Sequence, residues 1–292
     1  MTFVLTLVAS DKPLSVGHLA GIERFAAAQG IALTGEPVWL APHKAADIPI
    51  ASCLTQDQMK MLWDALKPAR IDIFCTSARN RRKKLLVADM DATITTCETL
   101  DELAAHAGIG EKIAAITARA MNGELDFKSA LKERVALLKN LPADALKKTL
   151  EATEISPGAE RLVKTMRASG AVCVLVSGGF TFFTGAIAGK LGFTQHHGNT
   201  LDIENGKLTG NVGEPILDKD AKREFLESYK REFGLDSTDT LAVGDGANDL
   251  PMLQEAGLGV GYRPKKILQD NLRNCLFYAD LSAILYAQGI KA

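Results

Sequence analysis

From Leu85 onward the chain alternates short apolar runs with amphipathic helical segments, and this alternation restricts the fold more than any other feature. The apolar runs have the length and composition of strands and cover Leu85–Ala88, Val172–Val176, His197–Ile203 and Thr240–Val243. Strands separated by helices predict an α/β fold with a doubly wound, mostly parallel (Rossmann-like) sheet. Such sheets bind ligands beyond the carboxyl ends of their strands, so functional residues are expected there.

A long helix-forming stretch separates the first two of these runs. From Thr95 to Lys164 about seventy residues are nearly all helix formers, whereas a crossover between parallel strands needs only about a dozen. The excess predicts a helical cap insertion at about 95–160, placed above the strand ends where it would cover a site.

Residues 1–80 have a different order of elements, strand–helix–strand–strand–helix–strand, which is typical of a ferredoxin-like α+β domain. They resemble ACT-type amino-acid-binding domains in that order alone. This stretch has no cluster of ionisable residues, so we interpret it as a regulatory or assembly domain through which a homodimer could form. The basic stretch 78–84 predicts the boundary with a catalytic domain at 81–292. The expected strands and helices are Phe3–Ala9, Ser15–Gln29, Glu36–Ala41, Asp47–Ser52, Gln56–Leu66 and Ile71–Thr76.

The composition argues against several classes of protein. The net charge is −1 and the sequence pI is about 6.5, so no nucleic-acid partner is expected and the basic stretch is interpreted as a solvated linker. No run reaches about 18 apolar residues, so no membrane span is expected. Five scattered cysteines without a Cys-x-x-Cys motif, and a start without a basic leader, predict a cytoplasmic protein with neither a disulfide framework nor a zinc site.

Two acids directly follow the first strand. In Leu-Leu-Val-Ala-Asp89-Met-Asp91-Ala-Thr93 an apolar run ends in carboxylates, which are costly to bury without compensation. A turn or a helix N-cap explains a single Asp equally well. A calcium loop is excluded because Ile94 and Leu100 stand where it requires Gly and Glu. The pair therefore indicates a bound cation or a phosphate chemistry.

The second strand ends at a hydroxyl and two glycines, Ser177-Gly178-Gly179. The backbone N–H groups of such glycines can approach an anion closely. An ordinary turn or helix cap has the same sequence, so this motif alone leaves both interpretations open.

Lys222 lies in a helix predicted over 219–233 and capped by Asp218. It falls at the centre of an apolar stripe formed by Phe225, Leu226, Tyr229 and Phe233. Because the helix dipole disfavours a cation in the first turn, a core-facing ammonium there indicates an anionic partner. A lysine that packs its stem on the core and extends its head to solvent is the alternative.

The fourth strand runs into Gly244-Asp245-Gly246-Ala-Asn248-Asp249. This is no dinucleotide fingerprint, because the third glycine is missing and Asp245 would repel a pyrophosphate. Acids at two neighbouring strand ends fit a Mg²⁺ site, since that ion prefers oxygen ligands. A plain turn is the alternative.

Taken together, Asp-x-Asp-x-Thr, Ser-Gly, Lys and Gly-Asp-Gly-x-Asn-Asp occur in this order at strand or helix ends and resemble the haloacid dehalogenase-like phosphohydrolases, from about Leu85 to Leu285. The resemblance implies a Mg²⁺ cofactor and a small phosphomonoester substrate. It implies that Asp89 is the nucleophile, Asp91 the general acid and base, and Lys222 a further catalytic residue. The implied phosphate-binding residues are Thr93, Ser177, Gly178 and Asn248. The implied metal ligands are Asp89, Asp91 and Asp245, with Asp249 behind them.

The cap sharpens the resemblance. The stretches Asp89–Glu98, 120–127, Leu131–Leu138 and Val176–Phe180 look like those of phosphoserine phosphatases. That family implies that Glu98 binds the substrate ammonium, Arg134 its carboxylate, and that Phe127 shields the site. The implied reaction is hydrolysis of O-phosphoserine to serine and phosphate, the last step of serine biosynthesis.

Helical geometry supports part of this assignment. Phe127 and Arg134 are seven residues apart, two turns of one helix, and share a face with Ala130, Leu131, Leu137 and Leu138. A guanidinium on an apolar face indicates a buried anion, which could be a substrate carboxylate or a protein acid. Glu98 has no such support, because Thr95-x-x-Glu98 also fits a capping box.

Other functions share some of these motifs. A phosphotransferase that uses phosphoserine, or a phosphatase for another small phosphorylated acid, would contain all of them. A phosphorylated signalling receiver is disfavoured by the Asp91-x-Thr93 pattern and by the long cap. A catalytically silent amino-acid sensor is disfavoured by the intact set of acids.

Overall fold

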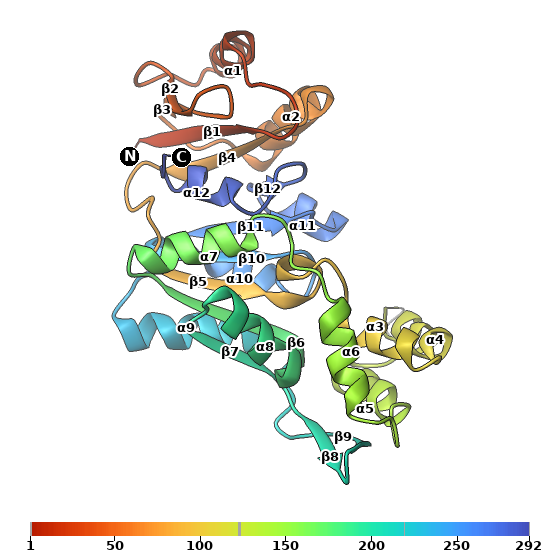
Figure 1. Cartoon of the computed structure of the whole chain (residues 1–292). Coiled ribbons are helices and arrows are strands. Elements are labelled where there is room, and N and C mark those ends of the chain that lie inside the picture. The colour runs from red at the N-terminus through yellow and green to blue at the C-terminus, as the bar shows by residue number, and fades with distance from the viewer. Residues whose placement is uncertain (1, 122–123, 219, 292) are drawn as a thin grey trace.

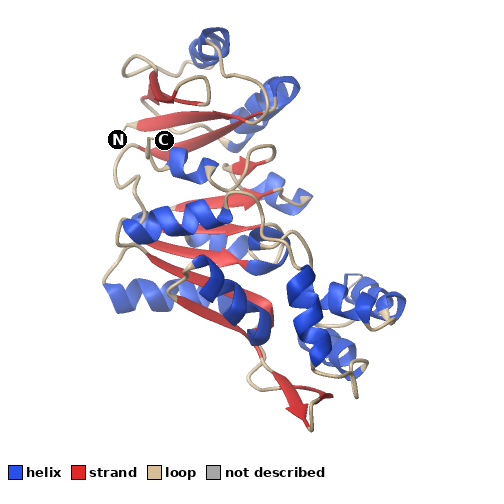
Figure 2. Ribbon diagram, in the orientation of Figure 1, coloured by secondary structure: helices blue, strands red, loops and turns tan. Residues whose placement is uncertain are grey.

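The computed structural model describes residues 2–121, 124–218 and 220–291. Its named strands form a four-stranded antiparallel sheet, a six-stranded parallel sheet and a two-stranded hairpin (Figures 1 and 2). The predicted fold class is confirmed: a doubly wound parallel sheet with a helical cap lies next to an N-terminal α+β sheet. In the described part of the chain, no helix is both long and apolar enough to cross a membrane.

The N-terminal sheet has the strand order β2-β3-β1-β4, the ferredoxin-like arrangement. One face of the sheet packs against two helices, with Leu5, Leu7, Ile48 and Ile73 in the shared core. The opposite face, which includes Phe74, packs against the rest of the molecule. The elements are β1 (Phe3–Ala9), α1 (Val16–Ala28), β2 (Val38–Ala41), β3 (Ala45–Ile50), α2 (Gln56–Leu66), the 3₁₀ turn η1 (Lys67–Ala69) and β4 (Ile71–Ser77).

The parallel sheet has the order β12-β11-β10-β5-β6-β7. Its strands are β5 (Leu85–Asp89), β6 (Val172–Phe180), β7 (Gln195–Asn199), β10 (Thr240–Gly244), β11 (Leu258–Tyr262) and β12 (Cys275–Leu276). The apolar side chains of one face pack with α7 (Ala159–Ala168), α8 (Thr181–Leu191) and α12 (Ala283–Ala287). Those of the other face pack with α9 (Ala221–Phe233), α10 (Leu250–Glu255) and α11 (Lys266–Asn271). Because β5 and β10 are parallel neighbours, their carboxyl ends lie side by side.

The cap consists of four helices that extend from the carboxyl edge of this sheet (Figure 1). They are α3 (Thr99–His106), α4 (Gly110–Met121), α5 (Phe127–Ala136) and α6 (Asp144–Ala152). Residues 122 and 123, within the stretch 120–127 that resembles phosphoserine phosphatases, lie outside the described residues. Leu208 exchanges backbone hydrogen bonds with the loop after α5, which joins the cap to the hairpin β8 (Leu201–Glu204) and β9 (Lys207–Val212).

The hairpin corrects one prediction from the sequence. The single strand expected at His197–Ile203 is wrong, because β7 ends at Asn199 and β8 pairs with β9 in a separate sheet. The turn between them is Asn205-Gly206, and both residues have positive φ. This dipeptide is a strong signal for a tight hairpin turn. Residues 201–204 pair across that turn with β9 and so do not continue β7.

The helix expected at 219–233 is present with a later start. α9 begins at Ala221 with Asp220 at its N-cap, and residue 219 lies outside the described residues. Asp218 is not the cap; its Oδ1 instead accepts a hydrogen bond from the backbone N–H of Asp220. The aspartate therefore shapes the turn that precedes the helix.

The N-terminal sheet is joined to the parallel sheet through buried polar contacts. Asp72 of β4 accepts hydrogen bonds from the backbone N–H groups of Phe277, Tyr278 and Ala279. Arg81 donates to Asp47 at 2.6 Å and to the carbonyl oxygens of residues 286 and 287. Both contacts involve the C-terminal segment, and the two chain ends lie near one another at this junction (Figure 1).

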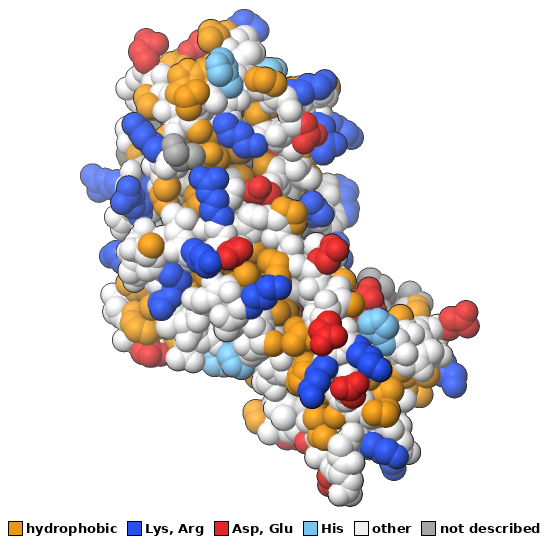
Figure 3. All heavy atoms as spheres, viewed as in Figure 1, with side chains coloured by type: hydrophobic (Ala, Val, Ile, Leu, Met, Phe, Trp, Pro, Cys, Tyr) orange, Lys and Arg blue, Asp and Glu red, His pale blue; other side chains and the backbone are white. Residues whose placement is uncertain are grey.

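The surface in the same view carries acidic and basic side chains interspersed with scattered apolar ones (Figure 3). This mixture agrees with the net charge of −1. The polar chemistry that distinguishes the molecule lies at the carboxyl edge of the parallel sheet.

Candidate active site

The first acid of the predicted pair ends a central strand. Asp89 is the last residue of β5 and is 4% exposed. The next turn, η2 (Met90–Ile94), is irregular, and Ala92 within it has φ of +52°. A non-glycine residue in this region is strained and is typical of functional loops. The turn brings Asp91 back over the strand end beside Asp89, where both line the same cavity.

Lys222 lies between two carboxylates beneath that cavity. Its Nζ is 2.5 Å from Asp89 Oδ1 and 2.5 Å from Asp249 Oδ1, and all three residues are almost fully buried. The solvent-reaching alternative for Lys222 is therefore wrong. The two carboxylates raise the pKa of Lys222 despite its burial, so it remains a cation. Burial and the neighbouring Asp249 raise the pKa of Asp89, and Lys222 opposes that shift.

Asp91 is held by hydroxyl groups on both of its oxygens. Oδ1 accepts hydrogen bonds from the backbone N–H of Thr99 at 2.8 Å and from its hydroxyl at 2.7 Å. Oδ2 accepts one from Ser177 Oγ at 2.6 Å, and that oxygen in turn accepts the N–H of Gly179 at 2.7 Å. The first turn of α3 in the cap and the end of β6 thus fix one carboxylate in a definite orientation.

Three acids at the sheet edge could hold a cation. Oxygen atoms of Asp89, Asp245 and Asp249 lie within 4.8 Å of one another. Asp249 is already engaged, because its Oδ2 accepts the backbone N–H groups of Asp245 and Gly246 and its Oδ1 accepts from Lys222. Among the described residues, Asp89 Oδ2 and Asp245 Oδ1 accept no hydrogen bond. Two free carboxylate oxygens with a third acid behind them suit a hard divalent cation.

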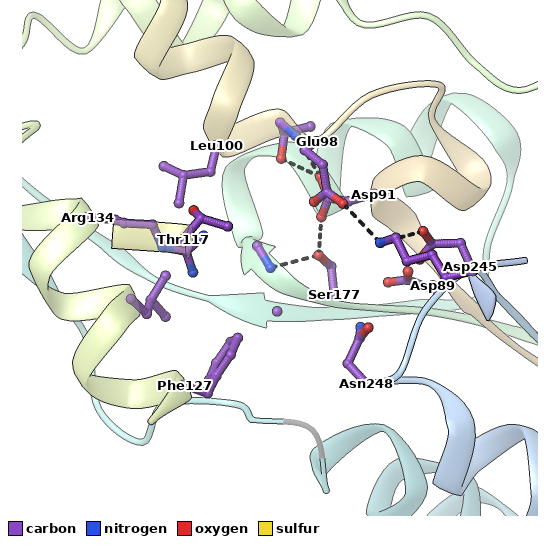
Figure 4. Close-up of a pocket in the computed structure, with 15 residues that line it drawn as sticks. Asp89, Asp91, Glu98, Leu100, Thr117, Phe127, Arg134, Ser177, Asp245 and Asn248 are labelled. Atoms are coloured by element: carbon purple, nitrogen blue, oxygen red, sulfur yellow. Dashed lines mark hydrogen bonds and ion pairs between the residues drawn. The ribbon is translucent and has the colours of Figure 1, made fainter. Parts of the chain in front are cut away.

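A cavity of about 320 Å³ opens above these groups and reaches the cap. In Figure 4, Asp89, Asp245 and Asn248 lie on one side of it, and Phe127 and Arg134 of α5 lie on the other. The remaining lining residues are Asp91, Glu98, Thr99, Leu100, Thr117, Leu131, Ser177, Gly178, Gly179 and Lys265. The structure therefore places one cavity between the acids of the sheet and the cationic side chain of the cap.

Arg134 faces this cavity without a carboxylate partner. Among the described residues no acid forms an ion pair with its guanidinium, which donates a hydrogen bond to the carbonyl of Ala130 one turn earlier. The alternative of an ion pair with a protein acid is thus wrong for the described residues. Leu137, which was expected on the same face, is the C-cap of α5 and is 39% exposed. Partial burial lowers the pKa of Arg134, and the charges of Asp101 and Glu98 oppose that shift, so the guanidinium stays a cation available to an anion.

Glu98 and Phe127 also line the cavity. Glu98 occupies the N-cap position of α3, and Thr95 donates its hydroxyl to the carbonyls of Met90 and Cys97, so the capping-box interpretation is wrong. Desolvation and the nearby Asp91 raise the pKa of Glu98 to about 7. Phe127 lies over Gly178, where an added Cβ would come within 3.2 Å of its ring.

Two further positions bear on the site. Thr93 is fully buried, does not line the cavity, and its Oγ1 has no hydrogen-bond partner among the described residues. Lys265, which sequence reasoning missed, lines the cavity with its Nζ 2.9 Å from Asp245 Oδ2 and 4.0 Å from Glu98 Oε1. The available signal was topological: Lys265 follows β11, a parallel neighbour of β10, and therefore reaches the same edge.

The geometry can now be compared with known proteins. A model of the haloacid dehalogenase-like hydrolases matches residues 86–254. The chain belongs to this family. The matched residues begin in β5 and end in α10. They therefore include both strand ends that carry the acids, and the cap between them.

Individual members of the family are similar over most of this chain. A phosphoserine phosphatase of Methanocaldococcus jannaschii is 40% identical over 205 residues, which are 70% of this chain and 97% of the relative. One of Archaeoglobus fulgidus is 43% identical over 194 residues, 66% of this chain and 56% of the relative, so the match spans little more than half of that protein. A probable phosphoserine phosphatase of Vibrio cholerae superposes with a TM-score of 0.77 at 30% identity over 99% of this chain and 88% of the other. This last likeness includes the N-terminal sheet.

Proposed function

We propose that the protein is a Mg²⁺-dependent phosphoserine phosphatase that hydrolyses O-phosphoserine through an aspartyl-phosphate. The observation that carries the proposal is the single cavity that joins Asp89 and Asp91 to the unpaired guanidinium of Arg134. If the phosphate group of O-phosphoserine binds at the acids, the carboxylate of the same small molecule lies in the cavity that Arg134 lines. The phosphoserine phosphatases among the relatives support this choice of substrate.

The nucleophile in this scheme is Asp89. Its carboxylate attacks phosphorus, the bond to the serine oxygen breaks, and an aspartyl-phosphate forms. Lys222 opposes the rise in the pKa of Asp89 that burial causes, and its ammonium donates a hydrogen bond that holds the carboxylate in position for in-line attack. Water then attacks phosphorus, releasing phosphate and restoring the carboxylate.

Asp91 moves the proton in both half-reactions. It gives a proton to the departing serine oxygen and later accepts one from the attacking water. The hydrogen bonds from Thr99 and Ser177 fix its carboxyl group, so that it lines the cavity beside Asp89. Ser177, the Gly178 N–H, Asn248 and Lys222 would stabilise the transferring phosphoryl oxygens; Thr93, buried outside the cavity lining, stays a prediction in this role.

The metal would be held by the Asp89 side chain, the Asp91 backbone carbonyl and Asp245, with Asp249 supporting them. When bound, Mg²⁺ neutralises charge on the phosphate and so permits a carboxylate to approach it. In the cap, Arg134 would bind the substrate carboxylate and Glu98 its ammonium, while Phe127 closes the site over Gly178.

A substrate screen tests the proposal. Phosphate release would be measured for O-phosphoserine, phosphoethanolamine, 3-phosphoglycerate and a sugar phosphate, with Mg²⁺ and with excess chelator. We expect the highest kcat/KM for O-phosphoserine, and only with Mg²⁺. A preference for a phosphate without an amino group would identify another small phosphorylated acid as the substrate. If serine formed with less free phosphate when a second alcohol is present, the protein would be a phosphotransferase.

The organisation around this site is also a proposal. We infer a catalytic domain at 81–292 with its cap at about 95–160, and a regulatory or assembly domain at 1–80. A homodimer through the latter, in a reducing cytoplasmic environment, would agree with its separate core and with the free cysteines. Light scattering of the full chain and of a 1–80 deletion tests the assembly: loss of a dimer on deletion supports the role, whereas an unchanged mass contradicts it.

A further inference from the structure

Two thiols meet at the N-terminal sheet, and neither lines the cavity of the catalytic acids. Cys53 lies in the loop between β3 and α2, and Cys75 lies in β4. Their sulfur atoms are 3.1 Å apart, although the residues are separated by 22 positions. All five cysteines are free, and no other sulfur–sulfur contact occurs among the described residues. The fold therefore brings one pair of thiols within bonding reach.

The surroundings give the two sulfur atoms different chemistry. The contact with Cys75 lowers the pKa of Cys53 to about 7 against the effect of burial, and the guanidinium of Arg273, whose Nη1 is 3.2 Å from Cys53 Sγ, adds to this. The same contact and burial raise the pKa of Cys75. Cys53 is partly exposed, whereas Cys75 is 5% exposed. A partly exposed thiolate beside a buried thiol is the arrangement of an attacking and a resolving cysteine.

The other three cysteines lack this arrangement. Cys173 and Cys275 are buried, and burial raises the pKa of both thiols well above neutral pH, to about 12 for Cys173. Cys97 is partly exposed, but burial and neighbouring acids raise its pKa as well. Thiolate character among the five cysteines is thus concentrated at Cys53.

We propose that Cys53 and Cys75 form a reversible disulfide when the protein meets a peroxide. The Cys53 thiolate attacks one peroxide oxygen, the O–O bond breaks, and hydroxide leaves as Cys53 becomes a sulfenic acid. Cys75 sulfur then attacks Cys53 sulfur, the S–O bond breaks, and water leaves with the thiol proton. Two thiols are oxidised by two electrons while one peroxide is reduced to water and hydroxide, and a dithiol reductant reverses the change.

The pair lies where the N-terminal sheet contacts the segment after α11. The backbone N–H of Cys75 donates to Asn274 Oδ1 at 2.8 Å, and Gln56 donates to the carbonyls of Gln269 and Leu272. A cavity of about 340 Å³, lined in part by Leu54 and Arg273, lies beside this contact. Oxidation removes the thiolate that faces the Arg273 guanidinium, so the disulfide changes the contact between the N-terminal sheet and residues 269–274.

Peroxide titration of the full-length protein tests the inference independently of any enzymatic activity. Reduced protein would be treated with hydrogen peroxide, alkylated, digested with trypsin without reduction and analysed by mass spectrometry. We expect two of the five thiols to be lost, with peptides 45–60 and 71–79 cross-linked, and both thiols to return with dithiothreitol. A disulfide between other cysteines, or irreversible oxidation of Cys53 with Cys75 still free, would overturn the proposal.

Variants separate the two sulfur roles. In Cys75→Ser, or in Cys75→Ala should the serine not fold, dimedone should trap a sulfenic acid on Cys53. Arg273→Ala should form the disulfide several-fold more slowly, and Arg273→Lys should restore much of the rate because it retains the positive charge. Cys97→Ser is the matched control and should still lose two thiols. Equal rates in the Arg273 variants would contradict the role given to that guanidinium.

Discussion

Asp72 and Asp89 are both buried carboxylates, and burial raises the pKa of each, yet their surroundings differ in one respect. Both oxygens of Asp72 accept backbone N–H groups, from residues 277–279. Asp89 Oδ1 accepts from Lys222, and its Oδ2 accepts no hydrogen bond from the described residues while facing a cavity. Both oxygens of Asp72 are thus occupied by backbone donors, whereas Asp89 keeps one oxygen that can bind a metal or attack a substrate.

The contrast shows that burial and a shifted pKa do not by themselves identify a reactive acid. A structural carboxylate is buried because backbone donors replace its water. A reactive one is buried beside a cation, with acceptor capacity left over for a metal or an electrophile. The number of unused oxygens, rather than the pKa shift, distinguishes the N-terminal junction from the catalytic edge.

The largest expected effect separates the two acids directly. Asp89→Asn removes the nucleophile while keeping its shape, so phosphoserine hydrolysis should fall by on the order of 10⁴-fold. Asp72→Asn, the matched control, changes a carboxylate that touches no cavity residue, and its folded fraction should keep near-normal kcat. Phosphate release per folded molecule, with circular dichroism to count folded protein, measures both. Near-normal turnover in Asp89→Asn would refute the mechanism.

A smaller effect concerns the opposite wall of the cavity. Arg134→Ala should raise KM for O-phosphoserine about 100-fold, since a charge-assisted bidentate pair with a carboxylate is lost. Phosphoethanolamine lacks that carboxylate, so its kcat/KM should be little changed and the preference between the two substrates should nearly disappear. Steady-state kinetics on both substrates decide the matter. An equal loss of kcat/KM on both substrates would mean that Arg134 stabilises the cap and does not bind the substrate carboxylate.

The sequence was sufficient for features that follow from local periodicity. Asp89 and Asp245 are predicted at strand ends because each follows an apolar run, and parallel strands bring their carboxyl ends together; Ser177 reaches the same edge, although β6 continues past it to Phe180. Phe127 and Arg134 were placed on one face because they are seven residues apart on a helix. These inferences needed only the pitch of a helix and the direction of strands.

Features set by tertiary contacts could not be predicted in this way. Lys265 lies in a polar stretch with no periodicity to set it apart, and its role depends on which strand neighbours β10. Thr93 stays a prediction at the phosphate, and the sequence could not show that its hydroxyl, next to the turn at Ala92, is buried without a hydrogen-bond partner among the described residues. Glu98 fitted a capping box because sequence spacing cannot show that Thr95 donates elsewhere.

A third test uses pH on Asp72 alone. Burial raises its pKa from 3.8 to about 6 in the folded protein, so the folded state binds a proton more tightly than the unfolded state. As pH falls through about 6 toward 4, wild type should therefore gain stability relative to Asp72→Asn, by about 2–3 kcal/mol. Urea unfolding of both proteins at pH 7, 5 and 4 gives this difference. A difference that stays constant with pH would mean that Asp72 does not titrate in this range.

The smallest effect concerns Lys265, the cation that shares Asp245 with the proposed metal site. Its ammonium is 2.9 Å from Asp245 Oδ2 but 54% exposed, so solvent screens much of its charge. Because a fixed cation opposes a second one at the same carboxylate, Lys265→Met should tighten Mg²⁺ binding by roughly 2- to 5-fold. Lys265→Arg should retain wild-type affinity, and calorimetric titration with Mg²⁺ measures all three proteins without turnover. Weaker binding in Lys265→Met would instead show that this lysine holds Asp245 in the orientation that the metal requires.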